Sequence, residues 1–382
     1  MALRVLHCPS NVGNHPQGLA RGERQAGLDS TCVVFEQSGF AYDVDELLET
    51  PNPLRFERRR WALLRRALRE ADVVHFNFGR SLFPPPLPGG ERLVHVPGRL
   101  YARFLALRDL PLLRRRGKTI AVTYQGDDAR QAHGSELPLP RRRLAEEIGD
   151  GYYTESGDAL KRRTIAAFDR YADRIFYLNP DLGDFLPARA QFVPYASVDP
   201  AEWQPRPPFS LREVPRILHA PSHRGIKGTE RVLEAVSQLR SEGVPLEFEL
   251  IEGLPRAEAR RAYERADLLV DQLLVGWYGG LAVELMALGK PVVCFIDEET
   301  ARRRAPGELV DDLPVVRASA ADLADILRGL LTARRSDYPQ LAERSRAFVE
   351  RWHDPVRIGA QMSAEYEAAR AEAQSRSRAS SS

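Results

Sequence analysis

The chain has 382 residues, of which 43% are hydrophobic and 28% are charged, and its formal net charge at pH 7 is +2. A chain of this length exceeds what one hydrophobic core usually supports, so we expect two domains of comparable size. Because it shows no run of eighteen apolar residues, no secretory signal and no metal-ligand cysteine spacing, we expect a cytoplasmic protein with reduced cysteines.

Strands and helices alternate through the first half of the sequence. The expected strands are Leu3–Cys8, Thr31–Phe35, Val73–Phe76, Thr119–Tyr124, Arg174–Leu178 and Gln191–Pro194, with helical patterns between them. Strands separated by helices favour a parallel, doubly wound sheet. This pattern predicts a first Rossmann-like domain over residues 1–198.

Candidate ligand-binding residues follow three of these strands, because ligands of doubly wound sheets bind at the carboxyl ends of the strands. Gly13 and Asn14 follow the first strand and would let the backbone approach a sugar or phosphate; an ordinary strand–helix turn is the alternative. His75 closes the third strand and could bind an acceptor, although a structural role explains it as well. Asp127 and Asp128 follow the fourth strand, where they could orient an acceptor hydroxyl or cap the next turn.

Segment 55–69 is rich in arginine and also carries large apolar residues. These are Phe56, Trp61, Leu63, Leu64 and Leu68. The pattern predicts a basic amphipathic helix that contacts an anionic membrane or an acidic acceptor, unless the arginines only reflect a GC-rich genome. No aromatic-basic platform for single strands and no recognition motif accompanies the charge, so nucleic acid is not an expected partner.

A proline-rich stretch separates the two halves of the chain. Five prolines between residues 199 and 215 disfavour regular structure and suit an interdomain linker. A second domain over 216–353 follows, with expected strands beginning at Arg216 and then at Glu247–Ile251, Leu268–Asp271, Pro291–Phe295 and Leu313–Val316. A helix is expected over 354–374. The tail 375–382 lacks large apolar residues and is predicted to be disordered.

Two stretches of the second half together suggest a nucleotide-sugar site. The first strand ends in a Pro/Ser/Gly loop and runs into a helix that starts near Lys227, an arrangement that directs backbone N–H groups at an anion. Lys227 would then lie beside a diphosphate. Downstream, the strand ending at Asp271 leads through the turn Gly276–Gly280 to a helix that carries Glu284, whose carboxylate can accept both ribose hydroxyls.

At these residues the chain resembles the retaining glycosyltransferases of the GT-B fold, in particular the family 4-like group. The donor motif of that family is a Glu, seven residues, a second Glu and then AMA-x-G-x-PVV. Its second half is matched by Glu284, Met286, Ala287, Gly289, Pro291, Val292 and Val293, and Gly279 matches an internal glycine. Gly276 replaces the first Glu and Ser222 replaces an upstream Arg, with His223 and Arg224 close behind. Asp271 or Gln272 could compensate for the missing Glu, or act only as loop or capping residues.

The loop TYQGDDAR (123–130) resembles a T-x-H-G-x-D loop of the same family, in which the histidine hydrogen-bonds the donor sugar. Gln125 replaces this histidine, while Gly126 and Asp128 match. A glutamine can donate and accept hydrogen bonds but cannot titrate, so we expect a positioning group at this place and no general base. Since no DxD metal motif lies at a strand end, Arg224, Lys227 and helix N-termini would have to neutralise the leaving group without a metal.

The resemblance implies an α/β protein of the GT-B type, with two Rossmann-like doubly wound domains facing a central cleft and a C-terminal helix that crosses back to the first domain. It further implies a metal-independent hexosyltransferase that needs no cofactor besides a UDP- or GDP-linked sugar as co-substrate. The sugar would pass to an unidentified hydroxyl acceptor with retention of configuration. The alternative is a catalytically impaired protein that binds sugars or nucleotides, because Gly276 and Gln125 depart from the motifs.

The candidate residues fall into three groups. The catalytic candidates are Gln125, Asp128, Arg224 and Lys227. The donor-binding candidates are Gly13, Asn14, Ser222, His223, Arg224, Lys227, Glu252, Asp271, Gly279, Gly280, Leu281 and Glu284. His75 and Asp127 are the candidates on the acceptor side.

Overall fold

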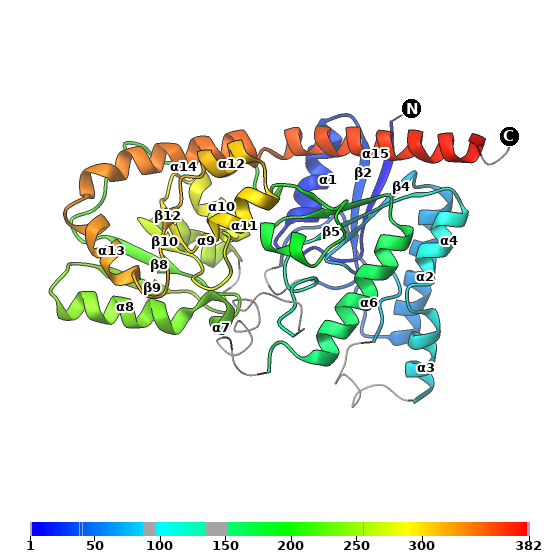
Figure 1. Cartoon of the computed structure of the whole chain (residues 1–382), viewed down its shortest axis with the longest axis horizontal. Coiled ribbons are helices and arrows are strands. Elements are labelled where there is room, and N and C mark those ends of the chain that lie inside the picture. Colours follow the sequence, from blue (N-terminus) through cyan, green and yellow to red (C-terminus); the bar gives the residue numbers. More distant parts are fainter. Residues whose placement is uncertain are drawn as a thin grey trace. The chain divides into compact units, whose positions relative to one another are not determined.

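The computed structural model describes residues 2–37, 39, 41–86, 96–133, 148, 151–254 and 256–379. It forms two compact units, each built on its own parallel β-sheet (Figure 1). Unit 1 contains the chain up to Ser197, apart from a short segment that ends at Tyr152, together with the chain from Pro355 onwards. Unit 2 contains Val198–Asp354 and that short segment. The expected α/β class with two Rossmann-like sheets is confirmed.

Seven parallel strands form the sheet of unit 1, in the order β3-β2-β1-β4-β5-β6-β7. Their bounds are β1 Arg4–Cys8, β2 Asp29–Val34, β3 Glu46–Leu47, β4 Val73–Asn77, β5 Thr119–Tyr124, β6 Arg174–Tyr177 and β7 Gln191–Phe192. The helices are α1 His15–Gln25, α2 Pro53–Arg69, α3 Val96–Leu105, α4 Asp109–Arg115, α6 Glu155–Tyr171 and α15 Pro355–Ala379, with a 3-10 helix, η2, at Pro180–Asp184. Strand β3 was not predicted, because its two exposed residues at the sheet edge give no alternating pattern.

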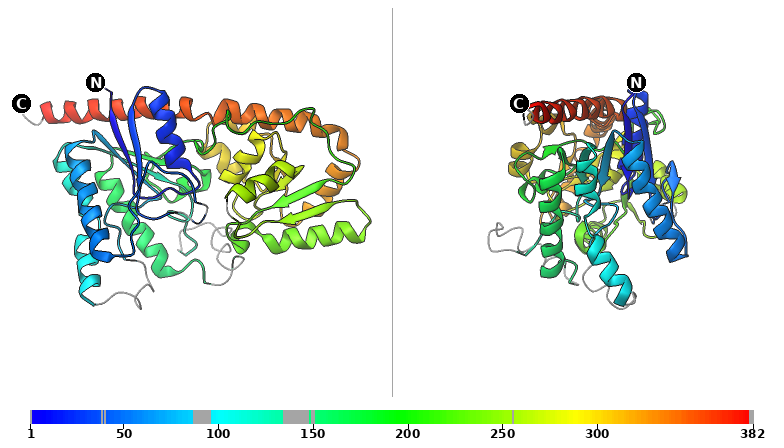
Figure 2. Two further views of the ribbon diagram at one scale, coloured as in Figure 1. Left: turned by 180° about the vertical axis from the view of Figure 1, so that it is seen from behind. Right: turned by 90° about the vertical axis from the view of Figure 1, so that its right-hand side faces the viewer.

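Alternate residues of these strands pack against different helices. Leu6, Val74 and Ile120 point into a core that α2, α4 and α6 complete. Helices α1 and α15 cover the opposite face and pack against each other (Figures 1 and 2). They approach so closely that a Cβ atom on Gly22 would overlap the carbonyl group of Pro355. The C-terminal helix is therefore an integral part of unit 1.

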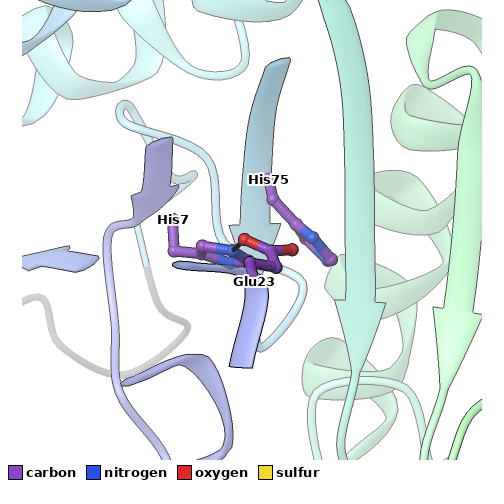
Figure 3. A group of neighbouring side chains, drawn as sticks. All are labelled: His7, Glu23 and His75. Carbon is purple, nitrogen blue, oxygen red and sulfur yellow. Dashed lines mark hydrogen bonds and ion pairs between the residues drawn. The ribbon is translucent and has the colours of Figure 1, made fainter. Parts of the chain in front are cut away.

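A buried polar cluster lies between α1, α15 and the sheet (Figure 3). His7 Nε2 lies 2.8 Å from Glu23 Oε2, and the hydroxyl of Tyr366 donates to Glu23 Oε1 over 2.8 Å. His75 bonds Tyr366 through Nδ1 at 2.6 Å and Thr123 through Nε2 at 2.7 Å. Among the described residues, His7, Glu23 and His75 form the one group that could hold a metal ion, and these hydrogen bonds already engage their ligand atoms.

The acceptor-side hypothesis for His75 is wrong. Its side chain is completely buried, because the alternation of β4 turns it towards α1 and α15 and away from the solvent. Burial lowers the pKa of His75 well below its usual value, so the ring is neutral and structural.

Helix α15 extends further than the sequence indicated. Residues 375–379, expected to belong to a disordered tail, continue the helix, and residues 380–382 lie outside the described residues. Arg174 of β6 reaches Glu365 at 2.8 Å and Glu372 at 2.7 Å, which fastens the second half of the helix to the sheet. Ion pairs with the sheet thus replace the large apolar residues that this part of the helix lacks.

Helix α2 directs its apolar side at the core. Leu63 and Leu64 are buried, and Phe56 and Leu68 pack against the same core, so the apolar residues of segment 55–69 do not form a membrane-facing surface. Trp61 is the exception, since it remains 39% exposed. The sequence pattern of an amphipathic helix is correct, but its apolar face belongs to unit 1.

The sheet of unit 2 has five parallel strands in the order β12-β11-β10-β8-β9. Their bounds are β8 Arg216–His219, β9 Glu247–Leu250, β10 Leu268–Val270, β11 Val292–Cys294 and β12 Val316–Arg317. The helices are α7 Arg224–Lys227, α8 Thr229–Ser241, α9 Arg256–Arg265, α10 Gly280–Ala287, α11 Glu298–Arg304, α12 Gly307–Asp312, α13 Leu323–Leu331 and α14 Tyr338–Trp352, with a 3-10 helix, η3, at Arg335–Asp337. Because β9 and β10 lie on opposite sides of β8, the strand order reverses between β8 and β10.

Segment 199–215 has no helix or strand, yet it is part of unit 2 and does not act as a free linker. Trp203 is 1% exposed, and the guanidinium of Arg260 lies 4.4 Å from the centre of its ring. The carbonyl of Pro200 accepts a hydrogen bond of 3.1 Å from Arg346. The prolines prevent regular structure, but Trp203 still fastens the segment to the unit.

In the described part of the chain, no helix is long and apolar enough to cross a membrane.

Candidate functional site

The carboxyl ends of β8 and β10 form the reversal point of the sheet in unit 2, which is where such sheets bind ligands. Lys227 follows β8 at the end of the one-turn helix α7, and Asp271 follows β10 directly. Lys227 Nζ and Asp271 Oδ1 lie 2.8 Å apart, and both side chains are largely buried. The structure therefore brings together two predicted site residues that are far apart in the sequence.

The helix expected to begin near Lys227 is in fact two helices, α7 and α8, joined at Gly228.

The second oxygen of Asp271 holds the start of helix α10. Its Oδ2 accepts a hydrogen bond of 2.7 Å from the backbone nitrogen of Gly279, which is the N-cap residue of α10. Gly280 and Leu281 form the first turn of this helix and are partly exposed. One carboxylate thus fixes Lys227 and the glycine-rich turn together, which prearranges a cation and a helix N-terminus at the same edge.

The position of the missing motif Glu cannot hold a side chain. A Cβ atom on Gly276 would lie 2.6 Å from the Cβ atom of Asp297, which caps helix α11. The next residue, Trp277, is fully buried, so the turn cannot move outward without exposing it. A carboxylate is instead present nearby on Asp271.

Glu284 lies in the middle of α10 and is 8% exposed. Within the described residues its carboxylate has no hydrogen-bond partner, and the charges that favour its ionised form are those of Arg256 and Arg260 of α9. Burial dominates and raises the pKa of Glu284 from 4.5 to about 7. A buried carboxylate without donors is ready to accept hydrogen bonds from a ligand, and such bonds would stabilise its charge.

The residues between β8 and Lys227 are more exposed. Ser222 is exposed, and the guanidinium of Arg224 donates to Glu230 at 3.0 Å and to Glu252 at 2.9 Å. His223 caps α7, because its Nδ1 accepts a hydrogen bond of 3.3 Å from the backbone nitrogen of Ile226. Arg224 and Glu252 would have to release each other before either could contact a donor.

Unit 1 presents its own loop at the carboxyl end of β5. Both carboxylate oxygens of Asp128 accept hydrogen bonds from the backbone nitrogen of Gln125, at 3.0 and 3.1 Å, and Oδ1 also accepts one of 2.7 Å from Gly126. Burial raises the pKa of Asp128 to about 7. The carboxylate of Asp127 accepts from Arg130 at 3.0 Å and from Tyr153 at 2.6 Å. Both acids therefore organise the loop, in agreement with the capping alternative.

The side-chain amide nitrogen of Gln125 is buried in this loop. Its side chain is 8% exposed, and its Nε2 has no hydrogen-bond partner among the described residues, although its backbone carbonyl accepts a bond of 2.6 Å from Asn179. An unpartnered buried amide donor costs stability, so such a group is usually satisfied by a ligand or an ordered water.

Within the described part of the chain, similar unpartnered atoms lie at the ends of the neighbouring strands. They are Nδ2 of Asn11 and Oδ1 of Asn14, both after β1, and Oδ1 of Asn77 at the end of β4. The other amide atom of Asn14 donates to the carbonyl of Ser197 over 2.9 Å. Gly13 has a φ of 58° and open space where a side chain would be, so its backbone is accessible. Because β1, β4 and β5 are adjacent, these polar groups share one sheet edge.

No family model and no curated protein sequence matches this chain. The structure, in contrast, resembles solved glycosyltransferases over nearly its whole length. The catalytic domain of starch synthase IV from Arabidopsis thaliana, bound to ADP and acarbose, has a TM-score of 0.59 at 11% identity, covering 97% of this chain and 100% of that chain. Sucrose-phosphate synthase from Thermosynechococcus elongatus has a TM-score of 0.58 at 14% identity, with 96% and 98% covered. The chain has the GT-B fold.

A third GT-B structure, HepE from Anabaena in complex with UDP-glucose, has a TM-score of 0.58 at 11% identity and covers 96% of this chain and 100% of that chain. At this level of identity, the similarity establishes the fold, while the chemistry has to be argued from the site residues. Sequence reasoning missed Asn11 and Asn77. Their positions could have indicated them, because Asn11 lies close to the candidates Gly13 and Asn14, and Asn77 lies close to the candidate His75, each after an expected strand.

Proposed function

We propose that this chain is a glycosyltransferase that moves a hexosyl group from a UDP- or GDP-linked sugar to a hydroxyl acceptor, with retention of configuration. The observation that supports it best is the arrangement in unit 2. Three groups follow strands that meet at the reversal point of the sheet: Lys227, the N-terminus of α10 and the carboxylate of Glu284. Among the described residues, none donates a hydrogen bond to this carboxylate. Nucleotide binding at such a point uses these kinds of group.

In the proposed reaction, the residues of unit 2 bind the donor and stabilise the leaving group. Glu284 accepts hydrogen bonds from the ribose hydroxyls. Lys227 and the N-terminus of α10 lie against the diphosphate, whose negative charge grows as the glycosidic bond breaks. Asp271 keeps Lys227 in place before the donor arrives. Arg224 adds a second cation when it releases Glu230 and Glu252.

The residues of unit 1 bind the acceptor in this proposal. Amide groups at the ends of β1, β4 and β5 offer both donors and acceptors, which suits a substrate with hydroxyl groups. Gln125 positions a substrate hydroxyl through its unpartnered amide and carries no proton in the reaction. Analysis of the anomeric configuration of the first-formed product by NMR tests whether configuration is retained.

Substitution of Gln125 by alanine should lower turnover roughly tenfold to 150-fold, because one hydrogen bond of about 1.5–3 kcal/mol is lost. The affinity for nucleoside diphosphate should stay nearly unchanged, since Gln125 belongs to unit 1. Steady-state kinetics and calorimetric titration measure the two quantities. Removal of an unsatisfied buried amide should not destabilise the fold.

A suitable control for Gln125 is Gln131, which is equally buried but has hydrogen bonds at both amide atoms, to Ala129 and to Arg162. Gln131→Ala should lower stability and leave turnover per folded molecule unchanged. Full activity of folded Gln125→Ala would separate the loop from the active site. A chain that neither transfers nor hydrolyses any donor, yet binds it, would instead be the catalytically impaired alternative.

We expect activity to survive treatment with EDTA. Lys227 and the N-terminus of α10 already supply positive charge at the proposed diphosphate site, and no DxD pair lies at a strand end. Initial rates should be equal in EDTA and in added Mg²⁺ or Mn²⁺. A strict requirement for a divalent cation would contradict this prediction and make Asp127 the first carboxylate to test, since it is the more exposed acid of its loop.

A further inference from the structure

Helices α2 and α3 of unit 1 carry an exposed apolar patch that the fold does not use. Leu54 is 78% exposed on α2, and Leu100 and Phe104 are 64% and 68% exposed on α3. Trp61 joins the two helices, because its Nε1 donates to the hydroxyl of Tyr101 over 2.8 Å. We call these five residues the α2–α3 patch. Side chains as large as these are rarely exposed together unless they bind something.

The patch follows the helical period on both helices. Leu54 and Trp61 are seven residues apart, and Arg58 and Arg65 continue the same stripe at intervals of three or four residues. On α3, Leu100 and Phe104 are four residues apart and therefore lie on one face. Apolar and basic residues thus alternate along one face of α2, and the hydrogen bond from Trp61 to Tyr101 connects this face to α3, which lies on the same side of unit 1 in Figure 1.

The charge around the patch is positive and largely unpaired. In the part of the chain that the structure describes, no carboxylate pairs with Arg58, Arg65 or Arg103. The one acidic residue within α2, Glu57, is already engaged by Arg60 and by the hydroxyl of Tyr101. A partner that covers the patch must therefore bring apolar groups and negative charge together.

We propose that the α2–α3 patch binds the surface of an anionic lipid bilayer. Leu54, Leu100 and Phe104 would insert between acyl chains, Trp61 and Tyr101 would lie at the headgroup level, and the arginines would contact lipid phosphates. Arg108 lies 5.2 Å from the centre of the Phe104 ring, where a headgroup could reach it as the ring inserts. Aliphatic side chains fit a lipid surface better than a nucleic acid, which offers flat bases to aromatic rings.

This patch differs from the surface that the sequence suggested. The apolar residues predicted to contact lipid on segment 55–69 are mostly in the core. Four of the five patch residues lie outside that segment, because Leu54 precedes it and Leu100, Tyr101 and Phe104 belong to α3. The inference is independent of the proposed reaction, since it rests only on the surface of unit 1.

Co-sedimentation of the full chain with vesicles tests the proposal. The chain should bind vesicles that contain phosphatidylglycerol, bind phosphatidylcholine vesicles weakly, and dissociate as salt is added, because the attraction is partly electrostatic. Leu100→Ser/Phe104→Ser should lower the partition coefficient on anionic vesicles by about tenfold, through the lost insertion of two large side chains. Both residues are exposed, so the variant should fold, which circular dichroism verifies.

Matched controls distinguish vesicle binding through the α2–α3 patch from nonspecific adsorption of the chain to vesicles. Arg58→Ser/Arg65→Ser should weaken binding to anionic vesicles and leave binding to neutral vesicles unchanged, whereas Val214→Ser and Arg240→Ser, exposed residues of unit 2, should change neither. The proposal is overturned if the chain does not bind anionic vesicles or if Leu100→Ser/Phe104→Ser binds as well as the unmodified chain. Two other results would also overturn it: patch-dependent binding of RNA in place of vesicles, or light scattering that shows the patch joining two copies of the chain.

Discussion

Substitution of Lys227 by alanine should lower turnover by about 10²–10³-fold, the effect of removing one preorganised group that faces developing charge. The expected loss in donor affinity is smaller, because the charge on the leaving diphosphate is greater in the transition state than in the bound donor. The single variant also leaves the buried carboxylate of Asp271 with the Gly279 nitrogen as its one partner among the described residues. We therefore expect a loss of stability of about 3–5 kcal/mol as well.

The double variant Lys227→Ala/Asp271→Asn separates these two effects. It removes both charges of the buried pair, so urea unfolding should show that much of the stability returns, while steady-state kinetics should show that turnover does not. Lys290→Ala, which removes a partly buried lysine elsewhere in unit 2, should leave turnover unchanged. If the double variant regained normal turnover, Lys227 would serve only to neutralise Asp271, and its catalytic role would be wrong.

Replacement of Glu284 by glutamine should have two opposite effects. The affinity for donor and for free nucleoside diphosphate should fall by about 1.5–3 kcal/mol, or roughly tenfold to 150-fold, because charged hydrogen bonds to the ribose are lost. Stability above neutral pH should rise. Since burial raises the pKa of Glu284 from 4.5 to about 7, the native state holds a proton that the unfolded chain has already released between these values.

The sign of this pH dependence follows from the raised pKa. The stability that Glu284 contributes in its protonated form is present at low pH and is lost as the pH rises through 7, so the unmodified chain becomes less stable over this range. Glu284→Gln cannot ionise and should escape that loss, which amounts to an effect on the order of 3 kcal/mol above neutral pH. Urea unfolding at about pH 5 and about pH 8 measures it.

Glu234→Gln is the matched control, because Glu234 is exposed on α8 and pairs only with Arg231 at the surface. It should change neither nucleotide affinity nor the pH dependence of stability. A variant Glu284→Gln that binds nucleoside diphosphate as tightly as the unmodified chain would remove Glu284 from the site, whatever its effect on stability.

The sequence predicted the sheets well, because their strands are short apolar runs between helical patterns. Strand β5, Thr119–Tyr124, was predicted with its observed bounds, and the starts of β6 and β8 were also correct. Lys227 and Asp271 were both selected from their positions at strand ends, but their ion pair was not foreseeable, since it depends on the strand order of unit 2. A single sequence gives the ends of strands but not which strands are neighbours.

The errors share a physical origin, because pattern alone does not say what covers an apolar or polar face. The period of α2 identified an amphipathic helix correctly, yet Leu63 and Leu64 contact the sheet of unit 1 and not a membrane. His75 was expected at a strand end but lies in the middle of β4, and strand alternation turns it towards Tyr366, which is almost three hundred residues away in the sequence. Gly276 looked like a lost functional residue, whereas its place is closed by Asp297.

The central claim is that the carboxyl edge of the sheet in unit 2 binds the nucleoside diphosphate of a sugar donor. Calorimetric titration of the full chain with UDP- and GDP-linked hexoses, and with the free nucleoside diphosphates, tests it most directly. We expect saturable binding of one nucleotide type, weakened alike for donor and nucleoside diphosphate by Glu284→Gln and nearly unaffected by Gln125→Ala. Binding that Glu284→Gln and Lys227→Ala/Asp271→Asn leave unchanged, or no binding of any UDP- or GDP-linked sugar, would contradict the claim.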